Sequence, residues 1–252
     1  MNNSIKITDN GVFLHISTPL IQGWQKAEKP EDLSWFVEGI NKPPQEGLHW
    51  MGARIPMGLF RYVIGTIRKF PKMEVGFVLY YNTQKKLWKI HCPKQFGHGA
   101  AVHFEDDPAQ VKDGFFPVGT IHTHPNMGAF WSGTDLADQK GRYGLHMVFG
   151  LRDGQIVESK ITLFTPVKGT DIPYDEIFAD DVDFSADCPE HQDWVRTIML
   201  QFDPKFQLKV GDRTYGPHEQ EKPKRPRKRK KPEEMTDKEL CRYLKRIGFD
   251  GC

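Results

Sequence analysis

Hydrophobic side chains in the middle of the chain follow two different periods. Between residues 57 and 69, apolar residues lie on one helical stripe, which predicts an amphipathic helix that ends before Pro71. After Glu74 the chain has short strand-like runs separated by turns, and those over 145–151 and 156–164 alternate strongly between apolar and polar residues. The predicted strands are 74–81, 87–91, 101–105, 115–124, 145–151 and 156–164, with turns at 82–86 and at Asp153-Gly154.

A short helix is predicted between two of these strands, over residues 132–140. The order helix, strands, short helix, strands predicts an α+β fold with a mixed, mostly antiparallel curved sheet flanked by helices. A further helix is predicted over 184–202, with its apolar face made of Trp194, Val195, Ile198, Met199 and Phe202.

Charge divides the C-terminal third into two contrasting segments. Residues 171–193 hold nine acidic residues and no Lys or Arg, whereas residues 222–232 hold eight basic residues and three prolines. After the basic segment, a Thr-x-x-Glu capping box precedes apolar residues at helical spacing, which predicts a short terminal helix: Thr236, Glu239, Leu240, Tyr243, Leu244 and Ile247.

We therefore expect four parts along the chain. Residues 1–52 form an N-terminal extension or small accessory module, and 53–168 form the core. Residues 169–220 form an acidic extension with a helix, and 221–252 form a basic linker that carries the terminal helix.

Composition is that of a globular protein, with 252 residues and a net charge of +2. No apolar run approaches the roughly 20 residues that span a bilayer, and the first twenty residues lack the pattern of a signal peptide, which favours the cytoplasm. The four cysteines form no C-x-x-C pair, so we expect reduced thiols at Cys92, Cys188, Cys241 and Cys252.

Candidate chemistry lies at the end of the strand predicted over 115–124. Residues two apart on a strand project from the same face, so His122 and His124 can bind one metal ion. A hydrolytic zinc site needs three protein ligands and an open position. Asp135 is the natural third ligand, because Ser132 is a good helix N-cap and a strand-to-helix connection would fold the first helical turn back towards the histidines.

Each of these residues also has an ordinary structural interpretation. A lone His-x-His pair is more often two polar residues on a half-exposed strand. Glu74 could face solvent at the start of its strand, Ser132 could be only a cap, and Asp135 could be only a favourable charge at a helix N-terminus.

The spacing favours the metal site. The motif resembles the signature of JAMM (MPN-plus, or JAB) metallopeptidases over about residues 55–165. It consists of His122-x-His124-Pro125, then six residues, Ser132, two residues and Asp135, together with the upstream Glu74. The resemblance implies a JAB/MPN-like fold of cytidine-deaminase-like architecture. It also implies one zinc ion per chain held by His122, His124 and Asp135, with Glu74 as the acid/base on a zinc-bound water and Ser132 as the oxyanion donor.

Among enzymes of this family, the chain resembles the prokaryotic JAB type that deconjugates bacterial ubiquitin-like proteins. This implies a ubiquitin-like protein or its conjugate as substrate, and activating and conjugating enzymes of the same operon as partners. Three alternatives stay open: an inactive JAB-fold scaffold, a DNA-associated RadC-like protein and a phage-tail peptidase. The basic residues 222–231 could bind polyanions as an auxiliary function, and no membrane interaction is expected.

Four residues near this motif stand outside the predicted ligand set. We interpret His98 and His103 as loop or substrate-facing residues rather than ligands. Phe130 and Trp131 could line the substrate groove, although anchoring of their loop is the simpler interpretation.

Overall fold

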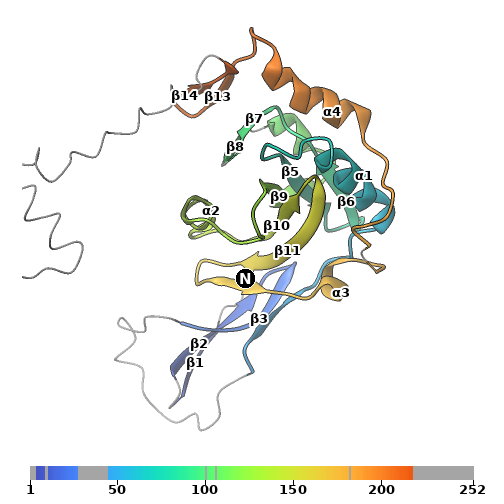
Figure 1. Cartoon of the computed structure of the whole chain (residues 1–252). Helices are drawn as coiled ribbons and strands as arrows, with labels where there is room; N and C mark the ends of the chain where they lie inside the picture. The colour runs from blue at the N-terminus through green and yellow to red at the C-terminus, as the bar shows by residue number, and fades with distance from the viewer. Residues whose placement is uncertain are drawn as a thin grey trace, which may run out of the picture.

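The centre of the molecule is a six-stranded sheet with the order β12-β11-β10-β9-β5-β6 (Figure 1). The computed structural model describes residues 4–8, 11–27, 45–99, 101–105, 107–181 and 183–217. Of the neighbouring strands in this sheet, β9 and β10 run parallel and the other pairs run antiparallel. The strands are β5 (Gly76–Asn82), β6 (Leu87–His91), β9 (Phe115–Pro125), β10 (Gly144–Arg152), β11 (Gln155–Phe164) and β12 (Gly169–Asp171). The predicted α+β fold with a mixed sheet is therefore confirmed.

One face of this sheet packs on α1 (Met57–Ile67), which follows the predicted helix closely. The apolar stripe of α1 meets alternate residues of four strands, and these side chains are withdrawn from water: Phe60, Val63, Ile64, Ile67, Phe77, Leu79, Ile121, Met147, Phe149, Ile161 and Leu163. Burial of each such side chain stabilises the fold by roughly 1.5–3 kcal/mol. The sheet is thereby fixed as a platform whose other face is left for polar residues.

The opposite face of the sheet carries α2 (Gly133–Gln139), and Figure 1 shows α1 and α2 on opposite sides of the strands. Cross-strand partners share a face, so the register arranges the side chains of this face in rows. One row contains Thr120, His146 and Thr162, and the next contains Gly76, His122 and Val148. The candidate site lies on this face.

A second, antiparallel sheet precedes the core, in the order β1-β2-β3-β4. It consists of β1 (Ser4–Thr8), β2 (Gly11–Ser17), β3 (Ile21–Lys26) and β4 (Gly47–Trp50). The apolar side chains of Ile16, Ile21 and Leu48 join the main hydrophobic core, and the Trp50 ring stacks on Trp88 at a centroid distance of 5.3 Å. None of these strands was predicted from the sequence.

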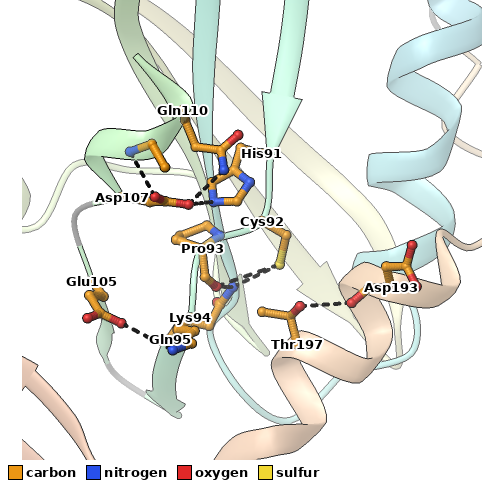
Figure 2. Close-up of polar contacts among 11 residues, drawn as sticks. His91, Cys92, Pro93, Lys94, Gln95, Glu105, Asp107, Gln110, Asp193 and Thr197 are labelled. Atoms are coloured by element: carbon orange, nitrogen blue, oxygen red, sulfur yellow. Dashed lines mark hydrogen bonds and ion pairs between the residues drawn. The ribbon is translucent and has the colours of Figure 1, made fainter. Parts of the chain in front are cut away.

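Two small hairpins lie beyond the edge of the main sheet. One is formed by β7 (Gln95–His98) and β8 (Ala101–Phe104), and the other by β13 (Leu208–Val210) and β14 (Arg213–Tyr215). Figure 2 shows polar contacts around the first hairpin: Lys94 pairs with Glu105 at 3.9 Å, and Asp107, before the short helix η2 (Pro108–Gln110), contacts His91 at 3.5 Å. The first contact closes the segment between β6 and β9 on itself, and the second ties it to His91 of β6.

The helix predicted over 184–202 is shorter in the structure. After α3 (Tyr174–Ile177), helical structure resumes in α4 (Gln192–Met199) and continues in η3 (Leu200–Phe202). Residues 184–190 instead run along α1, where Arg68 donates hydrogen bonds to the carbonyl oxygens of Phe184 and Ala186. A side chain on Gly65 would collide with the backbone of Pro189, so a glycine is needed where this segment crosses the helix.

The apolar face predicted for this last helix is only partly correct. Trp194, Val195 and Ile198 pack against the core, but Met199 and Phe202 are 55% and 61% exposed. In this last turn the buried side chain is Gln201, whose Oε1 accepts from the Gly97 N–H of β7, so Met199 and Phe202 are left exposed.

Three further sequence predictions can be placed against the structure. Cys92 and Cys188 are free thiols, as expected. No helix in the described ranges is both long and apolar enough to cross a membrane. The basic linker and terminal helix predicted over 221–252 lie outside the described residues.

Candidate metal centre

The two histidines of the motif lie near the C-terminal end of β9, on the face opposite α1. Both side chains are largely buried, and their Nε2 atoms are 3.1 Å apart. Parallel pairing with β10 fixes them in place, because His122 lies beside Val148 and His124 beside Gly150. The predicted co-facial arrangement of the two rings is thus present.

Asp135 reaches the histidines from the first turn of α2. Ser132 is the N-cap of this helix, as predicted, and the two residues form a reciprocal capping box. The Asp135 backbone N–H donates to Ser132 Oγ at 3.2 Å, and the Ser132 backbone N–H donates to Asp135 Oδ2 at 2.8 Å. The same contacts that begin the helix therefore hold the Asp135 carboxylate in position.

The three side chains converge as a candidate metal-binding set. Asp135 Oδ1 is 3.5 Å from His122 Nε2, and Asp135 Oδ2 is 3.9 Å from His124 Nε2. All of the candidate ligand atoms lie within 4.8 Å of one another. Two ligands about 2.1 Å from a tetrahedral zinc ion are about 3.4 Å apart, so the pair distances of 3.1, 3.5 and 3.9 Å are close to those of a zinc site.

The hydrogen bond at the far side of His124 supports the same fit. His124 Nδ1 lies 3.3 Å from the carbonyl oxygen of Gly128. A carbonyl oxygen can only accept a hydrogen bond, so Nδ1 carries the proton and Nε2 of the neutral ring keeps its lone pair for a metal. Burial and the neighbouring His122 lower the pKa of His124, which favours this neutral form.

Glu74 comes to the site at the entrance to β5. Gly76 of β5 pairs with His122, and one residue earlier the Val75 carbonyl accepts from the Thr123 backbone N–H. The antiparallel register therefore continues beyond the strand and sets Glu74 opposite His124. Glu74 is 5% exposed and lines the same cavity as the three candidate ligands. The predicted acid/base is therefore a neighbour of the metal-binding set.

The two carboxyl groups of the site differ strongly in acidity. Burial, reinforced by the negative charge of Asp135, raises the pKa of Glu74 to about 8. Burial would also raise the pKa of Asp135, but hydrogen bonds and charge from His122 and the contacts with Ser132 outweigh it and lower the pKa to about 2. One carboxyl is thus a permanent anion suited to a cation, and the other can take up and release a proton near neutral pH.

These residues border a cavity of about 720 Å³. Its floor is the polar face of β9, one wall is α2, and the remaining walls come from β8, Glu105 and residues 209–211 of the last hairpin. Ser132 also lines it. The Ser132 hydroxyl oxygen accepts from Asp135, so its own proton remains to be donated, either to the Asp135 carboxylate or into the cavity.

The four residues that were set apart from the ligands have different roles. His98 and His103 do not join the metal-binding set; they lie on the hairpin of β7 and β8 rather than in a loop, and His103 lines the cavity with its ring stacked on Tyr215 at 4.0 Å. Trp131 anchors its loop, because its Nε1–H donates to Thr162 Oγ1 at 2.9 Å. Phe130 lines the cavity and stays half exposed.

Sequence reasoning missed the far wall of the cavity, formed by Lys209, Val210 and Gly211. It also missed His146, which lies beside the site and contacts Thr120 Oγ1 through Nδ1 at 2.8 Å. Burial, and to a lesser extent His122 and Arg142, lower the pKa of His146 to about 3, so it stays neutral. Alternation along 145–151 could have placed His146 on the polar face, but no local pattern connects residues 209–211 with this site.

The central part of the chain is similar to a known protein family. Residues 62–161 match a family model described as prokaryotic homologs of the JAB domain. This range contains Glu74, both histidines, Ser132 and Asp135. No curated protein matches the chain.

Proposed function

Residues 62–161 are a JAB-family domain, and from this premise and the geometry of the site we propose that the chain is a zinc-dependent peptidase or isopeptidase. The family includes metallopeptidases and also members without activity, so the site has to carry the argument. The observation that carries it is the convergence of His122, His124 and Asp135 within 4.8 Å in a cavity that also contains Glu74.

The five polar residues divide three tasks in the proposed reaction. Zinc held by His122, His124 and Asp135 would supply Lewis acidity and a water with a pKa of about 7. Glu74 accepts a proton as general base and later gives it to the leaving amine. Ser132 donates its hydroxyl proton to the developing oxyanion, an interaction that contributes roughly 3–4 kcal/mol in other hydrolases.

For the substrate, we propose a ubiquitin-like protein joined to an amine through its C-terminus. The support is the likeness of the motif to that of prokaryotic JAB deconjugases, together with a cavity that is walled by several elements and open to solvent. Activating and conjugating enzymes would then be the partners, and auxiliary polyanion binding by 222–231 stays a proposal from the sequence alone.

Cleavage of a ubiquitin-like fusion protein by wild type and by Glu74→Gln tests this function. The amide keeps the size of the side chain but cannot act as a base, so we expect turnover to fall at least about 100-fold while zinc stays bound. Equal turnover in the two proteins would remove Glu74 from the mechanism.

The same assay separates an enzyme from a JAB-fold scaffold. A scaffold would bind the ubiquitin-like protein without cleaving it, and substitution of Glu74 would then change neither zinc content nor product. Ser132→Ala gives a second point, since loss of an oxyanion donor is expected to lower turnover about 10²–10³-fold without loss of the metal.

A further inference from the structure

We infer that Glu158, outside the predicted site, is a positioning residue for His124 and acts on it through the peptide group between Gly128 and Ala129. The inference rests on the proposed function only in requiring that His124 Nε2 binds a metal ion. It assigns a role to the loop 126–131 that the sequence motif leaves unexplained.

Three strands set these residues in one row across the sheet. His124 of β9 pairs with Gly150 of β10, and Gly150 pairs with Glu158 of β11. Directly opposed residues project from the same face of a sheet, so His124 and Glu158 flank the position of Gly150 on the face that carries the site. They lie one strand too far apart for a direct contact, and a third group is needed between them.

The missing side chain of Gly150 makes room for that group. A Cβ at position 150 would lie 2.6 Å from the Met127 carbonyl oxygen, 2.8 Å from the Gly128 carbonyl carbon and 2.9 Å from the Ala129 nitrogen. The loop backbone therefore lies directly over the glycine. Gly128 is equally constrained, because a Cβ there would lie 2.5 Å from Glu158 Oε2.

The peptide group over Gly150 is hydrogen-bonded at both of its ends. Its N–H, from Ala129, donates to Glu158 Oε2 at 2.9 Å. Its carbonyl oxygen, from Gly128, accepts from His124 Nδ1 at 3.3 Å. A carboxylate, a peptide group and an imidazole thus form one chain of hydrogen bonds, all with the same direction.

This direction strengthens His124 as a ligand. An N–H that donates to a carboxylate leaves more negative charge on the carbonyl oxygen of the same peptide group, since hydrogen bonds in a chain polarise one another. That oxygen then holds the Nδ1 proton more strongly, which fixes the ring orientation and makes Nε2 a better donor to a metal. Metal-binding histidines often donate a hydrogen bond directly to a carboxylate or to a carbonyl. Here His124 donates to a carbonyl whose peptide group in turn donates to the Glu158 carboxylate.

Zinc affinity, measured on the full chain by competition with a chelator, tests this role. Glu158→Gln keeps an oxygen acceptor for Ala129 but removes the charge, so we expect affinity to fall about 3–10-fold with no change in the unfolding temperature of the metal-free protein. Glu158→Ala removes the acceptor as well, and a loss of about 10–100-fold is expected. Asp153→Asn, in the turn that joins β10 to β11, removes the same charge away from the loop and should bind zinc as wild type does.

A spectroscopic measurement separates this role from simple support of the loop. In the zinc-loaded protein, the NMR signal of the His124 Nδ1 proton should move upfield in Glu158→Gln, because the carbonyl acceptor is weaker, and stay in place in Asp153→Asn.

Three results would overturn the inference and leave the proposed function standing. They are wild-type zinc affinity in both Glu158 variants, an unmoved Nδ1 proton signal in Glu158→Gln, and an equal loss of zinc affinity in Asp153→Asn. A wild-type chain that binds no zinc would instead overturn the proposed function, and this role with it.

Discussion

Glu74 is the residue on which the chemistry of the site depends most. Its carboxyl group is withdrawn from water and faces the anion of Asp135, and together these raise its pKa to about 8. A cation bound beside it would favour the ionised form again. A metal ion would therefore turn Glu74 from a neutral acid into the base that the reaction needs.

This raised pKa predicts how pH affects the metal-free protein. Glu74 ionises near pH 4.5 in the unfolded chain but near pH 8 in the folded one, so the folded state binds more protons between these values. Stability should therefore be lost as pH rises from about 5 to about 8. We expect Glu74→Gln to lack this loss. Unfolding temperatures, measured with a chelator at several pH values, should therefore show that the variant gains stability relative to wild type as pH rises.

Other groups titrate in this range too, and His146 opposes the trend. Its folded pKa of about 3 lies below the unfolded value of 6.5, so its contribution to stability is lost as pH falls through this range. Both proteins contain His146, so its contribution cancels when the unfolding temperature of wild type is subtracted from that of Glu74→Gln at each pH. A difference that stays constant across the pH range would contradict the raised pKa of Glu74.

At the scale of elements, close strand pairing positions the histidines. Gly119 lies directly before Thr120 of the first polar row on β9 and pairs with Leu145 of β10. A Cβ at Gly119 would be 1.6 Å from the Leu145 carbonyl oxygen, so a side chain here would push the two parallel strands apart.

Gly119→Ala should therefore destabilise the protein by about 3 kcal/mol or more. Gly133→Ala is a matched control in α2, where nothing lies within 4 Å of the added Cβ, and it should be neutral or stabilise the protein by up to about 1 kcal/mol. Urea unfolding of the two metal-free variants checks both values. Similar midpoints for the two would contradict this account of the strand pairing.

Elements with a strong local signal could be predicted from the sequence. The stripe of α1, the hairpin of β10 and β11 with its Asp153-Gly154 turn, and the Ser132 cap all follow from patterns within a few residues. The closeness of His122, His124 and Asp135 followed as well, because a strand, a short loop and a capped helix bring them together.

The elements that were missed depend on contacts between distant segments. The N-terminal strands pack through Ile16, Ile21 and Leu48 on a core whose other members lie far along the chain. Strand β13 has three residues, and its place at the cavity comes from contacts with β8. Glu158 shows the same limit at the level of a single residue. Its alternating pattern predicts only a strand face, whereas its connection to His124 needs the register of three strands and the path of a loop.

At the scale of the whole molecule, Gln25 joins the N-terminal sheet to the core. Its side chain is 1% exposed, accepts from Thr165 Oγ1 at 2.5 Å and donates to Thr170 Oγ1 at 2.7 Å. These partners lie at the end of β11 and on β12, the edge strand of the main sheet. The N-terminal sheet is thus attached by apolar packing and by one buried polar cluster.

Gln25→Ala should destabilise the protein by about 1–3 kcal/mol, because it leaves buried hydroxyl groups without their partner. Gln22→Ala, at an exposed position of the same strand, should have almost no effect. Thermal unfolding of both variants checks the difference, and equal unfolding temperatures would show that the cluster contributes nothing to the attachment.

The zinc content of the purified full chain tests the central claim most directly. After dialysis against trace zinc, mass spectrometry should find about one zinc per chain in wild type and in His98→Ala, and almost none in His124→Ala or Asp135→Ala. Wild-type protein without stoichiometric zinc, or ligand variants that keep it, would contradict a metal centre built from His122, His124 and Asp135.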